Sequence, residues 1–393
     1  MDNQHLVVIN AGSSSIKFAV YELNAGLDKV YQGLVENIHL KPKLKVFDRD
    51  HNLIKEENFA TDSDYPFFFK LLLEKLSEPE FKLHLVAAGH RIVHGGRSFY
   101  DPMLVTHDLI QQLKEFIPFA PLHQPYNIKA MEVIAEFAPE LKQIACFDTA
   151  FHRTHPRIAD SFALPQSLTE EGVKRYGFHG LSYEFIKHKL EEMGLLNSNK
   201  RIIIAHLGNG ASMCAVKEGK AIDSTMGFTA LDGLMMGTRC GNLDPGVLLY
   251  LLEFKKLSHK ELEKLLYQQS GLLGVSGLSS SVKDLLESTE PKAKFALDLF
   301  VYRIRKELGA LTSVLGGLDC LVFTGGIGEH AWPIREAVCR DNEWLGININ
   351  PLANNTNEQL ISNEESKVAV YAIPTDEEWI IAHHCRHLLI KEN

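Results

Sequence analysis

The chain has 393 residues, 45% of them hydrophobic and 23% charged, which is the balance of a globular protein with a sizeable core rather than of a fibrous or disordered one. A length of this order predicts about two domains. The formal net charge is −9 and neither sign forms a long block, so we expect no nucleic-acid partner.

We also expect no membrane partner. No segment approaches roughly 18 uninterrupted apolar residues, the length that a membrane span requires. The N-terminus shows neither the basic region nor the cleavage site of a signal peptide, so we expect the protein in the cytoplasm. The six cysteines lie far apart and form no C-x-x-C pair, which favours reduced, buried thiols over a zinc cluster or a disulfide framework.

Two segments show the same pattern of a strand, a turn of small polar residues and a second strand. They are residues 6–20, with the turn at 10–15, and residues 202–216, with the turn at 208–212. The pattern predicts two hairpins of the same kind, and therefore a duplicated architecture.

A third glycine-rich turn, residues 325–330, follows the apolar strand 320–324, and a helix is predicted just after Pro333. Apolar residues at helical spacing predict further helices before Gly194 and before Gly316. The last helix is expected to start at Thr375, whose spacing from Glu378 is that of a capping box. Strands and helices alternate, which predicts an α/β fold.

Charged and polar residues stand near several of these strands. Arg91 lies in an apolar context between His90 and His94, and it indicates either an internal ion pair or a site for a carboxylate or phosphate. Arg239 likewise indicates either an internal ion pair or a site for a carboxylate or phosphate. The two histidines would share one face of a strand, but without a third ligand they are weak evidence for a metal. Asp148 ends an apolar strand, where open α/β sheets collect catalytic groups.

Glycine-rich turns after strands leave backbone N–H groups free to bind anions, and three of them favour a polyphosphate ligand. No G-x-x-x-x-G-K-[ST] motif occurs. The spacing Gly326-x-Gly328-x-x-Ala331 matches a dinucleotide fingerprint, but too little chain follows it to complete a nicotinamide-binding domain, which such a motif normally begins.

Taken together, the motifs resemble the acetate kinase family, which belongs to the superfamily of acetate and sugar kinases, heat-shock chaperones and actin. The matching blocks, in the same order as in the family, are residues 8–17, 90–96, 147–152, 176–180, 206–212, 233–239, 325–329 and 374–378. The resemblance implies two duplicated ribonuclease H-like, actin-like ATPase domains with an active-site cleft between them. We expect one domain at residues 1–150 plus 377–393 and a second, carrying nucleotide-binding loops, at 151–376.

The reaction that the resemblance implies is reversible, direct in-line transfer of the ATP γ-phosphoryl group to acetate, giving acetyl phosphate and ADP. Arg91 and Arg239 would hold the carboxylate and the phosphoryl oxygens, and His179 would stabilise those oxygens in the transition state. Asp148 is the family's other essential acid. We expect it to position Arg239 or the metal's waters, because acetate is already ionised and needs no base. The resemblance also implies a homodimer.

Further roles follow from the same resemblance. Mg²⁺, or Mn²⁺ in its place, would be held through Asn10 and Glu377. The acyl pocket would comprise Arg91, Val93, Leu122, Phe178 and Ala230. The nucleotide site would comprise Ser13, Ser15 and Lys17; His206, Leu207, Gly208, Asn209 and Gly210; Ser281, Val282 and Lys283; and Gly326, Ile327, Gly328, Glu329 and His330.

The sequence departs from the family at a few of these positions. Ala230 stands where the family usually has proline, which widens the acyl pocket and makes propionate a credible second substrate. Residues 281–283 replace an acidic-x-Arg step near the adenine, and His330 replaces a usual asparagine, so the base preference stays open. The alternatives are a propionate or other short-chain acyl kinase and, from other classes, an actin-like nucleotide-binding module or a nicotinamide-dependent dehydrogenase.

Overall fold

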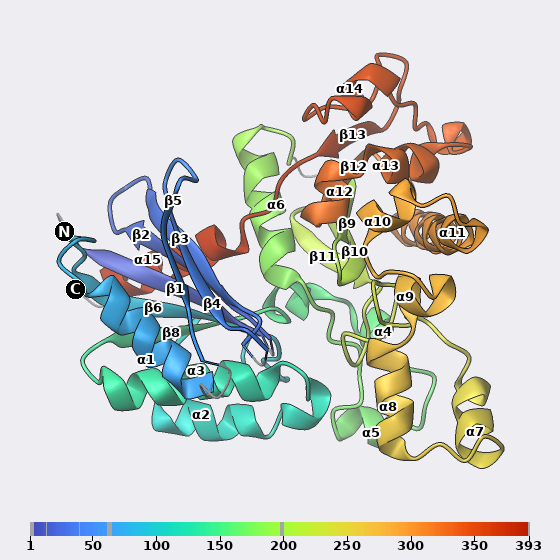
Figure 1. Cartoon of the computed structure of the whole chain (residues 1–393). Coiled ribbons are helices and arrows are strands. Elements are labelled where there is room, and N and C mark those ends of the chain that lie inside the picture. Colours follow the sequence, from blue (N-terminus) through green and yellow to red (C-terminus); the bar gives the residue numbers. More distant parts are fainter. Residues whose placement is uncertain (1–3, 13, 39, 61–64, 197–199, 392–393) are drawn as a thin grey trace. The chain divides into compact units, whose positions relative to one another are not determined.

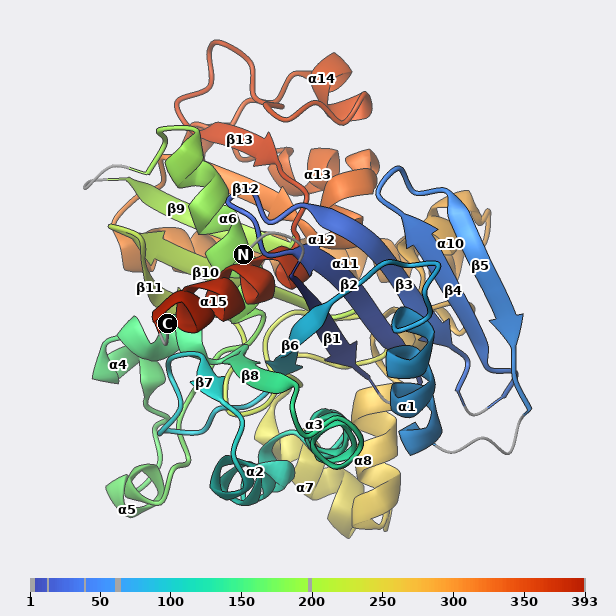
Figure 2. The same ribbon diagram turned by 90° about the vertical axis from the view of Figure 1, so that its left-hand side faces the viewer.

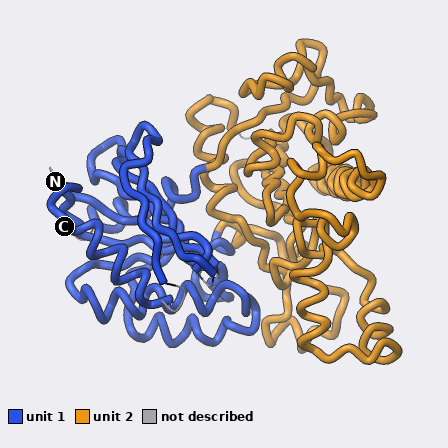
Figure 3. Tube along the Cα trace, viewed as in Figure 1, with its two compact units in different colours: residues 1–150, 376–393 blue, residues 151–375 orange. Residues whose placement is uncertain are grey.

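The computed structural model describes residues 4–12, 14–38, 40–60, 65–196 and 200–391. The chain divides into two compact units, the first made of residues 1–150 and 376–393 and the second of residues 151–375 (Figure 3). The first unit is completed by the C-terminal end of the chain. The functions that the sequence assigns to its two expected domains stay predictions.

The first unit contains a mixed sheet with the strand order β5-β4-β3-β2-β1-β6-β8-β7 among its described residues (Figure 2). Its strands are β1 (His5–Ala11), β2 (Ile16–Glu22), β3 (Lys29–Glu36), β4 (Lys43–Asp48), β5 (Leu53–Asn58), β6 (Leu85–Ile92), β7 (Met103–Leu104) and β8 (Lys142–Phe147). Strands β1 to β5 pair antiparallel in chain order, whereas β6 is parallel to both β1 and β8.

The second unit contains a sheet with the order β11-β10-β9-β12-β13 among its described residues. Its strands are β9 (Arg201–Leu207), β10 (Ala211–Lys217), β11 (Lys220–Ser224), β12 (Cys320–Thr324) and β13 (Ala369–Ala372). Strands β9, β10 and β11 form an antiparallel meander, and β12 is parallel to both β9 and β13. This is the topology of β3-β2-β1-β6-β8 in the first unit. The predicted hairpins and the predicted duplication are therefore confirmed.

Helices cover both faces of the first sheet. They are α1 (Tyr65–Leu76), α2 (His107–Lys114), α3 (Gln124–Phe137) and α15 (Glu377–Lys391). Ala88 of β6 faces the core cluster that contains residues of α1 and α3, whereas its neighbour Gly89 faces α15. A Cβ atom at Gly89 would lie 2.7 Å from the Cys385 Sγ atom, so the missing side chain lets α15 pack closely against the sheet.

The helices of the second unit lie on both sides of its sheet, with α6 and α11 on opposite sides in Figures 1 and 2. They are α4 (Arg157–Asp160), α5 (Gln166–Glu170), α6 (Gly180–Glu192), α7 (Pro245–Glu253), α8 (His259–Gln268), α9 (Gly271–Ser276), α10 (Val282–Glu287), α11 (Pro291–Leu315), α12 (Gly325–His330), α13 (Trp332–Cys339) and α14 (Pro351–Asn355). Short 3₁₀ segments lie at Ile117–Phe119, Ala150–Thr154 and Glu343–Leu345. Across the part of the chain that is described, no helix is both long and apolar enough to cross a membrane.

The structure corrects three local predictions. The glycine-rich turn after β12 is itself a helix, α12, because Gly325 with φ 74° lets the chain turn directly out of the strand. The last helix begins at Glu377 and is capped by Asp376, whose Oδ1 accepts from the N–H of Trp379 at 2.8 Å, so a cap at Thr375 was wrong. His94 lies beyond the end of β6 and does not share that strand with His90.

Candidate functional site

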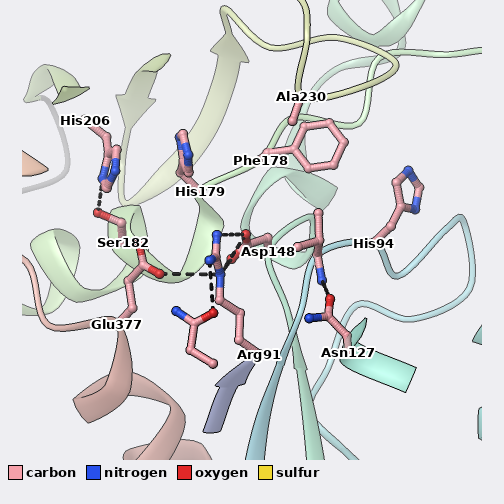
Figure 4. A network of polar contacts seen from close by, with 12 residues as sticks. Arg91, His94, Asn127, Asp148, Phe178, His179, Ser182, His206, Ala230 and Glu377 are labelled. Carbon is pink, nitrogen blue, oxygen red and sulfur yellow. Dashed lines mark hydrogen bonds and ion pairs between the residues drawn. The ribbon is translucent and has the colours of Figure 1, made fainter. Parts of the chain in front are cut away.

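Arg91 of β6 is surrounded by oxygen atoms of three side chains in the first unit (Figure 4). Its Nη2 donates to Asp148 Oδ2 at 2.5 Å, and its Nε lies 3.4 Å from Glu377 Oε2. Its Nη1 donates to Asn10 Oδ1 at 3.3 Å. These contacts join four residues that the sequence analysis selected separately.

Each of these residues stands at the end of a regular element. Asn10 lies near the end of β1, Asp148 follows β8 directly, and Glu377 is the first residue of α15. Strands β1, β6 and β8 run parallel, so their carboxyl ends meet at one edge of the sheet. Asp376 also anchors the start of α15, because its Oδ2 accepts from Lys29 Nζ at 2.8 Å.

The cluster is electrostatically coupled. Burial alone would lower the pKa of Arg91, but the charges of Asp148 and Glu377 outweigh burial and hold that pKa above its ordinary value. Asp148 is 1% exposed and the Arg91 side chain 18% exposed. Arg91 therefore stays a cation and retains an edge that solvent, and hence an anion, can reach.

Asn127 of α3 is a positioning residue that the sequence analysis missed. Its Nδ2 donates to the carbonyl of Ala11 at 2.9 Å, and its Oδ1 accepts from the N–H of Val93 at 3.0 Å. The side chain is buried and joins the end of β1 to the segment after β6. Asn127 carries no sequence signal for this role, because its two contacts come from distant parts of the chain.

In the second unit a chain of hydrogen bonds ends on His179. The Tyr183 hydroxyl and the Ser212 Oγ are hydrogen-bonded, and Ser212 Oγ lies 2.8 Å from His179 Nδ1. Burial raises the pKa of Tyr183 well above its ordinary value, so its hydroxyl keeps its proton. With Tyr183 donating to Ser212 and Ser212 donating to Nδ1, the remaining proton of a neutral His179 ring sits on Nε2.

His179 has an unusual backbone conformation and a ring partner. Its φ of 59° places it in the left-handed region, directly before α6. Its ring stacks on that of His206 with centroids 4.3 Å apart, and His206 Nδ1 lies 2.7 Å from Ser182 Oγ (Figure 4). The β9 strand and the start of α6 thus hold the two imidazoles as one stacked pair.

Gly210, His179 and Arg239 converge in the second unit. A Cβ atom added to Gly210 would lie 3.2 Å from His179 Nε2 and 3.8 Å from Arg239 Nη1. Arg239 Nη1 in turn donates to the carbonyl of Ala230 at 3.0 Å. The hairpin between β9 and β10 therefore brings a backbone without a side chain up to two groups that can donate to an anion.

The remaining predicted nucleotide residues occupy several places. Lys17 is exposed on β2, and Ser13 lies outside the described residues. Ser281 caps α10, since its Oγ accepts from the N–H of Asp284 at 3.3 Å. Gly208 to Gly210 form the hairpin turn, with the N–H of Gly208 donating to the carbonyl of Gly210 at 3.0 Å. Residues 326–330 belong to α12.

Arg335 is a second residue that the sequence analysis missed. Its guanidinium is fully buried and donates to the carbonyls of Gly328 and Glu329, each at 2.8 Å. It also donates to Asn354 Oδ1 at 2.8 Å and to Asn357 Oδ1 at 2.7 Å. Burial lowers its pKa to about 10. Arg335 thereby ties the end of α12 to the chain around α14.

The acyl-pocket candidates fall in both units. Val93 is buried and Leu122 half-buried in the first unit, whereas Phe178 is buried and Ala230 half-buried in the second. Val93 lies two residues from Arg91, and Phe178 is next to His179 in the sequence. Apolar and polar candidates therefore occur together in each unit.

The oxygen atoms around Arg91 suit a hard divalent cation. Asn10 offers a carboxamide oxygen, and Asp148 and Glu377 offer carboxylate oxygens, the ligand types that Mg²⁺ takes. All three lie against the same guanidinium. The residues present therefore fit a magnesium ion held directly or through its waters.

Comparisons with known proteins cover nearly the whole chain. A model of the acetokinase family matches residues 5–383. An acetate kinase from Rhodopseudomonas palustris is 50% identical over 386 residues, covering 96% of this chain and 97% of that protein. The crystal structure of Porphyromonas gingivalis acetate kinase matches with a TM-score of 0.87 and 38% identity, covering 98% of this chain and 100% of the other. That of a propionate kinase from Francisella tularensis matches with a TM-score of 0.91 and 35% identity, covering 97% and 98% respectively.

These matches agree with the topology described above. The α/β prediction and the duplicated actin-like ATPase fold are confirmed, since both units share one strand order and close structural neighbours cover both.

Proposed function

We propose a direct in-line mechanism from the premise that this chain belongs to the acetokinase family and is a phosphotransferase with a carboxyl group as acceptor. In one step, the chain transfers the ATP γ-phosphoryl group to acetate. The products are acetyl phosphate and ADP, and the reaction runs in both directions. The observation that carries the proposal is the buried cluster of Arg91, Asp148, Glu377 and Asn10.

The chemistry requires two anions to react. Acetate is ionised near neutral pH, and the γ-phosphoryl group carries charge on its oxygens, so their mutual repulsion must be neutralised. A guanidinium presents parallel N–H groups to a carboxylate or phosphate and keeps its charge at any working pH. Arg91, whose pKa is held above its ordinary value, supplies such a group in the first unit.

Arg239 supplies the second cation in the proposed site. Its Nη1 is oriented by the carbonyl of Ala230 at 3.0 Å, close to Gly210 and His179. We propose that Arg91 and Arg239 both neutralise charge on the two reacting anions. Water must be kept away from the reacting groups, because it otherwise accepts the phosphoryl group.

His179 would donate to the phosphoryl oxygens. The hydrogen bond from Ser212 to Nδ1 favours the tautomer with its proton on Nε2, the nitrogen nearest to Gly210. A donor aimed at oxygens that gain charge in the transition state lowers the barrier without changing its own position.

Magnesium would be held by Asn10 and Glu377, directly or through water. Bound there, the ion would neutralise charge on the ATP phosphates. Asp148 binds Arg91 and orients that guanidinium, so we assign it a positioning role toward Arg91.

The nucleotide would lie on the second unit. The hairpin at Gly208–Gly210 offers backbone N–H groups and no side chains, which suits the phosphates. Residues 326–330, held by Arg335, and the start of α10 at 281–283 would line the adenosine. Ser15 and Lys17 would assist at the phosphates from the first unit.

Propionate is the alternative acceptor. Ala230 stands where the family usually has proline, and the propionate kinase of Francisella tularensis has a TM-score of 0.91 with this chain. An apolar pocket discriminates one methylene by only about 1 to 3 kcal/mol, so some transfer to propionate is expected.

The test traps acyl phosphate with hydroxylamine. Purified protein is incubated with Mg²⁺, one donor (ATP, GTP or pyrophosphate) and one acceptor (acetate, propionate or butyrate). Acetate with ATP should give the largest yield, and Arg91→Ala should abolish it. Lack of trapped product with every donor and acceptor would overturn the proposal. Nucleotide hydrolysis that is independent of acyl acceptor would instead indicate an actin-like module, and nicotinamide turnover a dehydrogenase.

We also propose that the protein is a cytoplasmic homodimer. Helix α7 has the sequence PGVLLYLLE, yet none of its residues is buried. Leu249 is 60% exposed and Phe254, just after the helix, is 72% exposed. Large exposed apolar surfaces of this kind are typical of protein–protein contacts, and a second copy of this chain is the partner that the family resemblance implies.

A further inference from the structure

Three side chains that can bind transition metals meet inside the second unit, away from any role assigned above. They are His152 and His155, in the segment after β8, and Cys214 of β10. Each offers one ligand atom, and these atoms all lie within 4.8 Å of one another. The spacing of cysteines along the sequence gave no hint of this group, because the two segments meet only in the fold.

Two ring nitrogens of this group are buried without a hydrogen-bond partner among the described residues. They are His152 Nδ1 and His155 Nε2. His152 is 2% exposed, and the side chain of His155 is also 2% exposed. Burying a polar atom without a partner is unfavourable, and a native structure rarely leaves two such atoms side by side. The single S–H of Cys214 is a weak donor and is directed at the carbonyl of Ala215 at 3.7 Å, so it satisfies neither nitrogen.

The opposite nitrogen of each ring is already occupied. His152 Nε2–H donates to the carbonyl of Phe178 at 3.0 Å, and His155 Nδ1–H donates to Asp160 Oδ1 at 3.0 Å. Asp160 Oδ2 also accepts from Lys174 Nζ at 2.6 Å. A carbonyl or carboxylate on the far nitrogen is the arrangement that fixes metal-binding histidines, because it turns the lone pair of the other nitrogen toward the ion.

We propose that His152 Nδ1, His155 Nε2 and Cys214 Sγ form a site for one borderline-soft transition-metal ion, best Zn²⁺, with a water molecule as fourth ligand. Nitrogen and sulfur donors in this number suit Zn²⁺ rather than Mg²⁺, which takes oxygen ligands. In a tetrahedral zinc site, ligand atoms lie roughly 3.3 to 3.8 Å apart given bonds of about 2.0 to 2.3 Å. The three ligand atoms, which lie within 4.8 Å of one another, must therefore approach one another by about 1 Å.

The surroundings allow this movement. Arg153, Thr154 and Pro156, the neighbours of His155, are exposed, so the His155 side chain lies beneath a surface segment. A divalent ion with one thiolate carries a net charge of +1, which the carboxylate of Asp160 offsets only in part because Asp160 also pairs with Lys174. Binding releases the thiol proton of Cys214 to solvent, and no other bond is broken.

The site lies beside groups that hold His179. His152 holds the carbonyl of Phe178, the residue before His179, and Cys214 is two residues from Ser212 on the same face of β10. Occupancy of the site therefore acts on the segments that orient the proposed catalytic histidine, although the metal itself takes no part in phosphoryl transfer.

The test uses Co²⁺ as a spectroscopic substitute for Zn²⁺, added to chelator-treated protein without nucleotide or Mg²⁺. One equivalent per chain should produce a thiolate-to-Co²⁺ charge-transfer band, and one equivalent of Zn²⁺ should remove it. Cys214→Ala should lose the band. Cys320→Ala, which changes another buried cysteine of the same unit, should keep it. Far-UV circular dichroism verifies that each variant is folded.

Two further variants keep the test decisive if Cys214→Ala fails to fold. His155→Gln removes a ligand beneath the surface and should weaken Co²⁺ binding more than about 10-fold. Asp160→Asn keeps all three ligands and should weaken binding about 10- to 100-fold, as loss of such a supporting carboxylate does. No band in the unaltered protein, a band that survives Cys214→Ala, unweakened Co²⁺ binding in His155→Gln, or equal loss in Cys320→Ala would overturn the proposal.

Discussion

Asp148 binds Arg91 through both carboxylate oxygens, with Oδ2 2.5 Å from Nη2 and Oδ1 3.2 Å from Nε. Asp148 is 1% exposed, and its partner comes from the neighbouring parallel strand. An aspartate in this position is too deeply buried to meet substrate from solvent unaided. It is placed to fix the orientation of the guanidinium and to stabilise its charge.

Asp148→Asn should therefore reduce both activity and stability. Removing one partner of a buried ion pair leaves the other charge uncompensated, at a cost of about 3 kcal/mol. Acyl phosphate formation should fall by at least about 100-fold, because a mobile Arg91 no longer meets the reacting oxygens. The control is Asp319→Asn, which breaks the half-exposed pair with Arg201 and should cost at most about 1 kcal/mol with little loss of activity. Equal effects of the two variants would contradict the assignment.

Ser212→Ala should lower kcat by about 10-fold or more while leaving the fold intact, because His179 loses the donor that sets its tautomer. Tyr183→Phe is the matched comparison, since it keeps the bond between Ser212 and His179 and removes only the outer hydroxyl. Steady-state kinetics with acetate and ATP measure both. A Ser212→Ala enzyme with unchanged kcat would show that this hydrogen bond has no part in catalysis.

Ala230→Val should narrow the proposed acyl pocket without removing the backbone carbonyl that binds Arg239. We expect the ratio of kcat/KM for propionate over acetate to fall by about 10-fold, the discrimination that one or two methyl groups provide. Leu249→Val, far along the chain on α7, serves as a control for small apolar changes. An unchanged ratio would place Ala230 outside the pocket.

Stability should fall as the pH drops below about 6.5, partly because of His90. Burial lowers the pKa of His90 to about 4, against an ordinary value of 6.5. As the pH falls, His90 is protonated in the unfolded chain before it is protonated in the folded protein. The stability that neutral His90 contributes is therefore fully present above pH 6.5 and is lost as the pH falls toward 4. A shift of about 2.5 pH units corresponds to roughly 3 kcal/mol.

The measurement is urea-induced unfolding at pH 7, 5.5 and 4.5. His90→Gln keeps a polar group next to Gln143, which contacts His90 at 2.8 Å, and it should flatten the pH dependence. His51→Gln, at an exposed position, should leave it unchanged. If the free energy of unfolding of His90→Gln falls with decreasing pH as steeply as that of the unaltered protein, His90 does not contribute to the pH dependence of stability.

Helix α7 should contribute to the proposed dimer. Leu249→Glu combined with Phe254→Glu places two charges on an exposed apolar surface, which should shift the protein from dimer to monomer in light scattering. Lys294→Glu, on the exposed start of α11, adds a charge change elsewhere and should leave the mass unchanged. A double variant that keeps the mass of a dimer would exclude α7 from the interface.

Local patterns in the sequence were sufficient to identify the two hairpins, the α/β class and the helices α6 and α11. These features depend on residues close together in the chain, whose alternation or helical spacing is visible directly. Arg91 and Asp148 were selected from their positions in and after apolar strands, and the family resemblance added Asn10 and Glu377. It also located Gly210 and His179, but not the contacts between them.

The tertiary structure decided how those residues contact one another. Asn127 and Arg335 look like ordinary helix residues in the sequence, because their partners lie far away along the chain. Asp376, and not the predicted Thr375, caps α15, and Asp376 also binds Lys29 of β3. His152, His155 and Cys214 became a group only when β10 packed against the segment after β8. Hydrogen bonds and burial act through space, so one-dimensional spacing predicts elements well and long-range contacts poorly.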